Sequence, residues 1–129
     1  MSIQKDATSA SYLIDVAPLS QVLEDFAKAR DWAQLHSPKN LAMALTGEVG
    51  ELVEIFQWMT EEQSRSAGTH FETAQAIKDE LANVQLYLVR LAFALGVDLD
   101  EAVQQKLKKN ESKYPTEKAR GTSKKYTQL

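Results

Sequence analysis

Residues 41–59 read LAMALTGEVGELVEIFQWM, and their pattern is the clearest structural signal in the chain. Large apolar side chains recur there every three or four residues, as Leu41, Leu45, Val49, Leu52 and Phe56. This period places them on one face of a helix, so we predict a helix over residues 40–59 that packs against a partner. Ser37 and Pro38, just before it, are typical of an N-cap and a first helical turn.

The same helical period continues through most of the chain and predicts three further helices. Their expected spans are residues 19–32, residues 71–95, and a last helix from Asp98 or Asp100 to the residue before Pro115. Gly96 is suited to the left-handed C-cap that ends the helix before it. Residues 60–69 include Ser64, Ser66 and Gly68, and we expect them to form a loop.

The predicted fold class is therefore all-α, with a four-helix bundle-like subunit. The chain has 129 residues, which is the length of one ordinary domain. We expect a single domain over residues 1–129, with its core in residues 19–115 and with frayed ends before Ser11 and after Gly121.

Composition excludes several classes of site. The chain has no cysteine, so disulfides, zinc-thiolate sites, iron–sulfur clusters and cysteine nucleophiles are ruled out. No stretch approaches the roughly 18 consecutive apolar residues of a membrane-spanning helix, and the start of the chain lacks the pattern of a signal peptide. We therefore expect a cytoplasmic protein without a membrane partner.

Charge is distributed unevenly along the chain. Residues 106–129 carry eight Lys and Arg against two Glu, so this segment has a net charge of +6 within a chain of net charge −3. An acidic body with a basic tail suits a metal ion together with a polyphosphate, although a solvated tail without a ligand explains it equally well. We expect no nucleic-acid partner, because the tail lacks interleaved stacking aromatics.

Glutamates occupy unusual positions on the predicted helix over residues 40–59. On a helical wheel of this segment, Glu48 falls within the apolar face and Glu51 at its margin, while Glu54 points away to solvent. A carboxylate directed into a core is costly to desolvate unless a cation or a hydrogen-bond network receives it. Glu48 is therefore expected to have a partner.

The predicted helix over residues 71–95 is apolar around most of its circumference, as in a helix packed on two faces. One narrow polar strip interrupts it, formed by Glu80, Asn83, Tyr87 and Arg90. Spacings of three and four residues stack these side chains along one line. The strip is a candidate ligand site.

Antiparallel packing of these two helices could gather a set of oxygen ligands: Glu48, Glu51, Glu80 and Asn83. Oxygen-only sites favour Mg²⁺, Mn²⁺ or Ca²⁺. A di-iron bundle would require Glu-x-x-His, but neither His36 nor His70 stands three residues after a glutamate. Ordinary surface glutamates remain the alternative, and the inward position of Glu48 argues against it.

Aromatic and basic side chains supply candidates for binding an organic ligand. Trp32 and Trp58 could stack on a flat ring, although core packing is the usual role of tryptophan. Tyr87 could bond a sugar. Lys106, Lys109 and Asn110 lie late in the last predicted helix. The lysine ammonium groups could bind phosphate oxygens there, and the asparagine amide could hydrogen-bond a base edge.

Two segments resemble a known family: GEVGELVEIFQW at residues 47–58 and DELANVQLYLV at residues 79–89. They are similar to the MazG-like all-α nucleoside triphosphate pyrophosphatases, and particularly to the compact dCTP pyrophosphatase branch. The similarity extends over residues 19–126 and includes RDW at residues 30–32, HSPKN at 36–40 and NESKYP at 110–115.

The resemblance implies a homotetramer, a dimer of dimers with sites built across subunit boundaries. It implies that Glu48, Glu51 and Glu80 are catalytic and that they bind Mg²⁺, or Mn²⁺, together with Asn83. It further implies that Trp32, Trp58, Tyr87 and Asn110 line the pocket for base and sugar, with Lys106 and Tyr114 contacting the phosphates.

The implied reaction is metal-dependent hydrolysis of a nucleoside triphosphate to the monophosphate and pyrophosphate. We expect dCTP or a modified deoxynucleotide as the substrate, removed as nucleotide-pool house-cleaning. Members of the family usually have aspartate at the position of Asn83, and an amide brings neither a charge nor a proton acceptor. The alternatives are a nucleotide-binding form with weak or no turnover, and a helical scaffold that binds no nucleotide.

Overall fold

The computed structural model describes residues 11–129, and every regular element in that part of the chain is helical. The elements are α1 (Ala17–Ala29), η1 (Ala33–Leu35), α2 (Pro38–Phe56), α3 (Glu61–Ser66), α4 (Ala74–Leu95), α5 (Leu99–Lys113), α6 (Thr116–Ala119) and η2 (Tyr126–Gln128), where η denotes a 3₁₀ turn. The predicted all-α class is confirmed for these residues. The frayed N-terminus expected before Ser11 lies outside the described residues.

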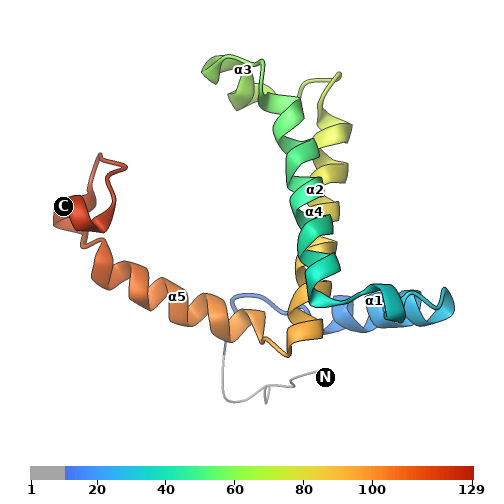
Figure 1. Cartoon of the computed structure of the whole chain (residues 1–129). Helices are drawn as coiled ribbons and strands as arrows, with labels where there is room; N and C mark the ends of the chain where they lie inside the picture. Colours follow the sequence, from blue (N-terminus) through green and yellow to red (C-terminus); the bar gives the residue numbers. More distant parts are fainter. Residues whose placement is uncertain (1–10) are drawn as a thin grey trace.

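An antiparallel pair formed by α2 and α4 carries most of the packing (Figure 1). Leu41 of α2 and Val89 of α4 are 1% and 0% exposed. Full burial of such a side chain contributes roughly 1.5–3 kcal/mol, so these contacts stabilise the pair. α1 crosses one end of the pair and packs against α4, with Ala27 of α1 buried.

Local sequence signals define the ends of the long helices. The Ser37 hydroxyl accepts a hydrogen bond from the Asn40 N–H at 3.2 Å and caps α2. Gly96 ends α4 with a left-handed φ of 67°, as predicted. Asp98 caps α5 by accepting from the Glu101 N–H at 3.2 Å, which confirms one of the two predicted starts of the last helix.

Both tryptophans lie outside the helices, so the predicted ends of two helices are wrong. α1 ends at Ala29, and Asp31 then adopts a left-handed φ of 54°, which turns the chain before Trp32. α2 ends at Phe56, and Trp58 lies beyond it. The helical period alone does not determine the last residue of a helix.

The loop predicted over residues 60–69 contains a short helix, α3, so that prediction is wrong. The Thr60 hydroxyl accepts from the Gln63 N–H at 3.1 Å, and the Gln63 side-chain oxygen accepts from the Thr60 N–H at 3.0 Å. This reciprocal capping box satisfies backbone N–H groups at the start of α3 that would otherwise lack a partner. It stabilises one turn and a half of helix despite the serine-rich composition.

The residues after Gly121 were predicted to fray, but they form regular structure. η2 forms there, and the ring of Tyr126 meets the ring of Tyr114 edge-on, with centroids 6.1 Å apart. The Lys113 ammonium lies 4.7 Å from the centre of the Tyr126 ring. These contacts attach the terminal residues to the end of α5.

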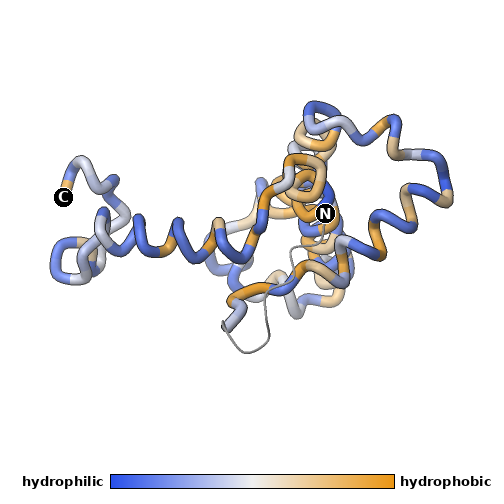
Figure 2. Tube along the Cα trace, turned by 90° about the horizontal axis from the view of Figure 1, so that it is seen from below, coloured by the Kyte–Doolittle hydropathy of each residue, from blue (hydrophilic) through white to orange (hydrophobic). Residues whose placement is uncertain are grey.

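α5 turns away from α4 by 98° and projects from the α2–α4 pair (Figure 1). Its first turn is anchored by Asp100, which is 3% exposed and accepts from the N–H groups of Leu13 at 2.7 Å and Ile14 at 3.1 Å. Much of α5 beyond that turn is hydrophilic (Figure 2), so it has no broad apolar face to bury against the pair. The predicted four-helix bundle-like subunit is therefore not formed within one chain.

No single helix in residues 11–129 is both long and apolar enough to cross a membrane. Taken together, α4 and α5 reach that length and composition, but they are bent by 98° at their break.

Candidate active site

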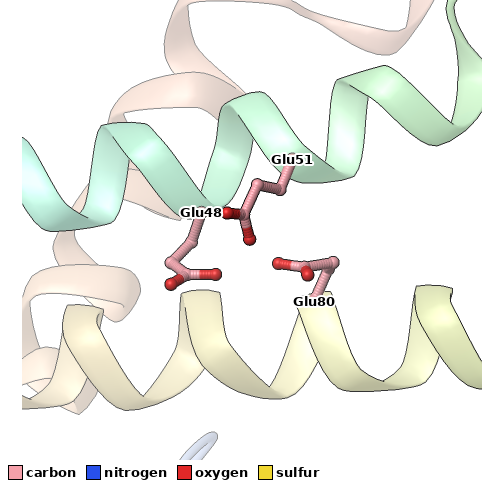
Figure 3. Close-up of side chains that lie close together, drawn as sticks. All are labelled: Glu48, Glu51 and Glu80. Atoms are coloured by element: carbon pink, nitrogen blue, oxygen red, sulfur yellow. The ribbon is translucent and has the colours of Figure 1, made fainter.

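Three glutamates face one another between α2 and α4 (Figure 3). Glu48 and Glu51 stand about one turn apart on α2, and Glu80 points toward them from α4. Each contributes one carboxylate oxygen to a group in which these oxygens lie within 4.8 Å of one another. The antiparallel pairing thus brings together three of the four predicted metal ligands, called the carboxylate trio below.

Two oxygens of the carboxylate trio have no hydrogen-bond donor among residues 11–129. Oε2 of Glu48 and Oε2 of Glu80 are buried, and no N–H or hydroxyl group of the described residues bonds to them. Sharing of a proton with the Glu48 carboxyl, burial, and the negative charge of Glu51 raise the pKa of Glu80 to about 7. Carboxylates this close repel one another when all are ionised, so either one of them retains a proton or a cation lies between them.

A divalent cation fits this arrangement. The donors are carboxylate oxygens, which are the ligands that Mg²⁺ and Mn²⁺ prefer. The two buried oxygens without a donor are atoms that a cation would satisfy. Asn83 follows Glu80 by three residues on α4, which places it on the same side of the helix. Its role as a fourth ligand stays a prediction.

A cavity of about 150 Å³ adjoins Asn83 and is lined by residues of α1, α4 and the linker between α1 and α2. Its walls include Phe26, Trp32, His36, Asn83, Tyr87 and Arg90. The Trp32 ring packs edge-on against Phe26 and His36, with centroids 5.7 Å and 6.3 Å apart. An aromatic wall of this kind suits a flat ring as ligand. The predicted binding residues Trp32 and Tyr87 do meet around one cavity.

Four other predicted binding residues do not meet this cavity within one chain. Trp58 is 90% exposed and lies after the end of α2. Lys106 and Asn110 lie on α5 and Tyr114 caps it, and α5 projects away from the pair that carries the carboxylate trio (Figure 1). Their predicted roles in binding stay predictions.

The structure also reveals a polar group that the sequence analysis did not assign. Arg90, 8% exposed, donates from Nη1 to Oε2 of Glu24 on α1 and from Nε to Nδ1 of His36 at 3.1 Å. The hydrogen bond from Arg90 holds the pKa of Glu24 below its usual value. Burial, and then the charge of Arg90, lower the pKa of His36.

A signal for this group was present in the sequence. Arg90 stands in the polar strip of a helix that is otherwise apolar, and Glu24 precedes the buried Ala27 by three residues, on the inward side of α1. Nothing local indicated that His36 would join them.

Comparisons with known proteins place the chain in a family. The profile of the MazG-like family matches residues 44–129. Over 105 residues the chain is 47% identical to human dCTP pyrophosphatase 1 and 44% identical to the bovine protein, covering 81% of this chain and 62% of each relative. The chain therefore spans less than two-thirds of the length of these relatives.

A solved structure has the same fold. The crystal structure of a pyrophosphatase from Archaeoglobus fulgidus superimposes with a TM-score of 0.73 at 34% identity, covering 82% of this chain and 97% of that one. The family resemblance noted in the sequence is thus confirmed by sequence and by fold. The chain belongs to the MazG-like family.

Proposed function

We propose that this chain is a Mg²⁺-dependent pyrophosphatase that hydrolyses dCTP, or a base-modified deoxynucleoside triphosphate, to the monophosphate and pyrophosphate. The observation that carries the proposal is the carboxylate trio, in which two buried oxygens have no donor among the described residues. Asn83, three residues after Glu80 on α4, lines an aromatic-walled cavity. The relatives named dCTP pyrophosphatase 1 and the solved pyrophosphatase support it. Such an enzyme acts on the nucleotide pool, so we propose the cytoplasm as its location.

We assign a different role to each group of side chains. The carboxylate trio would hold Mg²⁺, or Mn²⁺, with the Asn83 amide oxygen beside it, and a bound cation would offset the charge of the triphosphate. Trp32 and Tyr87 hold base and sugar in the cavity. A carboxylate of the trio in its ionised form accepts the proton of the attacking water, which must reach the α-phosphorus in line with the leaving pyrophosphate.

We further propose that the functional unit is a dimer of dimers. Val53, Leu81 and Trp58 are 54%, 53% and 90% exposed in the single chain, which is costly for apolar side chains of this size. A neighbouring subunit would cover them and would bring Lys106, Asn110 and Tyr114 to the phosphates and base. Light scattering on the purified protein tests this, with a tetramer expected and a monomer contradicting it.

Asn83 favours a second candidate, a nucleotide-binding protein with slow turnover. The amide supplies no charge to the cation and accepts no proton from water. Tight binding of dCTP with Mg²⁺ and a negligible rate of pyrophosphate release would support this candidate against the enzyme.

Incubation of the purified protein with dCTP and Mg²⁺ tests the proposal. We expect dCMP and pyrophosphate in equal amounts, loss of turnover with EDTA, and a loss of at least about 100-fold in Glu80→Gln, as for other groups that act directly on the reacting atoms. Glu54→Gln, at an exposed position of α2, is the matched control and should retain activity. Release of orthophosphate from dCTP would contradict the proposal.

A further inference from the structure

Arg90 is held at the wall of the cavity by groups from two other parts of the chain. Its Nη1 donates to Glu24 on α1, and its Nε donates to Nδ1 of His36, the residue before the N-cap of α2. The Arg90 side chain is 9% exposed and that of Glu24 is 19% exposed. A guanidinium bonded on two edges has little freedom to rotate.

These bonds also determine which polar atoms remain for a ligand. Arginine has five N–H donors and no acceptor, and within the described residues the hydrogen bonds of Arg90 use only Nε and Nη1. The N–H groups on Nη2 of Arg90 therefore remain available to a ligand, and Arg90 lines the cavity.

His36 offers a donor as well. Its Nδ1 accepts from Arg90, so the neutral imidazole carries its proton on Nε2. Burial and the charge of Arg90 lower the pKa of His36, which keeps the ring neutral near pH 7. Both residues line the cavity and form its polar wall, and each has an N–H group that no hydrogen bond among the described residues uses.

We infer that Arg90 and His36 form a donor edge that selects a base with two adjacent acceptors, as cytosine has in O2 and N3, and that Glu24 is a positioning residue for Arg90. This inference rests on the proposed function, because it places a nucleotide base in the cavity. Uracil and thymine present an N3–H next to O2. With these bases, the N3–H of the base would face an N–H of the donor edge. The two donors cannot bond to each other, so one of them is left buried without a partner.

A purely structural role of the ion pair, holding α1 against α4, makes a different prediction. In that case its removal lowers the melting temperature but affects cytosine and uracil nucleotides equally. The selectivity for cytosine over uracil is therefore the quantity that distinguishes the two roles.

The first experiment needs no variant. Binding of dCMP and dUMP to the wild-type protein is measured by calorimetry, and we expect dCMP to bind at least about tenfold more tightly, as for other sites that hydrogen-bond a base edge. Equal affinities overturn the inference. Because no bond is cleaved, this result is independent of whether the protein releases pyrophosphate from any triphosphate, which is the test of the proposed function.

The second experiment uses Glu24→Gln/Arg90→Met, which removes both charges together and leaves no buried charge unpaired. We expect the ratio of dCMP to dUMP affinity to fall to about one, and the ratio of kcat/KM for dCTP over dUTP to fall at least about tenfold. Retention of both ratios in a variant that is folded by circular dichroism overturns the inference.

A matched control is available on α3. Glu62→Gln/Arg65→Met makes the same two changes at an ion pair whose side chains are 91% and 67% exposed and 3.3 Å apart. This variant should keep the wild-type selectivity. An equal loss of selectivity in the control overturns the assignment to Arg90.

Discussion

Asn83 lines the cavity and follows Glu80 of the carboxylate trio by three residues on α4, and its amide carries no charge. We predict that Asn83→Asp raises the rate of pyrophosphate release and lowers the Mg²⁺ concentration needed for half-maximal activity, each by roughly tenfold, because a charged oxygen replaces a neutral one next to the cation. Steady-state assays over a Mg²⁺ titration provide the measurement. Gln85→Glu adds the same charge at an exposed position of α4 and should have no such effect. An unchanged Mg²⁺ requirement in Asn83→Asp would show that this residue is no ligand.

The lowered pKa of His36 predicts that the stability of the folded chain depends on pH. Its pKa is lowered in the folded chain by burial and by Arg90, so the unfolded chain takes up the proton first. The contribution of His36 to stability is therefore complete above the ordinary pKa of 6.5, and it is lost as the pH falls through the lower pKa of the folded state. His36→Gln should flatten the decline in melting temperature between about pH 7.5 and 5.5. His70→Gln, at an exposed position, serves as the comparison, and an equal flattening there would contradict the assignment.

At the scale of elements, the α2–α4 pair holds the carboxylate trio in place, and its core is small. Leu41→Ala should lower the free energy of unfolding by roughly 2–5 kcal/mol, because a side chain that is 1% exposed leaves a cavity when truncated. Met43→Ala, at a side chain that is 64% exposed on the same helix, should change it by less than about 1 kcal/mol. Urea denaturation at one fixed protein concentration measures both. Similar losses would indicate that the exposed face of α2 is also buried, as in an oligomer.

The elements differ in how well the sequence predicted them. The cap at Ser37 and the left-handed Gly96 act within one turn of helix, so the start of α2 and the end of α4 were predictable. α3 was missed because its serine-rich composition outweighed the capping box at Thr60 and Gln63. The direction of α5 depends on Asp100 bonding to residues more than 80 positions earlier in the chain, which no local pattern contains.

At the scale of the whole molecule, the proposed site is incomplete in one chain. If subunits share sites, as proposed, Glu80→Gln and Asn110→Ala damage different contributions to the same site. Each variant alone should be inactive or nearly so, whereas subunits co-expressed and purified as mixed oligomers should regain activity, because some sites then combine two intact halves. Pyrophosphate release from dCTP is the measurement. Recovery should fail for Glu80→Gln mixed with Glu48→Gln, since both changes lie in the same α2–α4 pair. Absence of recovery in the first mixture would contradict a shared site.

The sequence was sufficient for the all-α class, because the helical period is a property of single segments. The inward position of Glu48 and the polar strip that contains Glu80 indicated that Glu48, Glu51 and Glu80 would meet if the two long helices packed antiparallel, and in the structure they do. It was not sufficient for the place of Trp32, the projection of α5 or the group formed by Arg90. Arg90 bonds to residues 54 and 66 positions away, and such contacts arise only when α1, the linker and α4 pack together. Packing between elements distant in the chain therefore produced the polar wall of the cavity, on which the choice of base depends in our proposal.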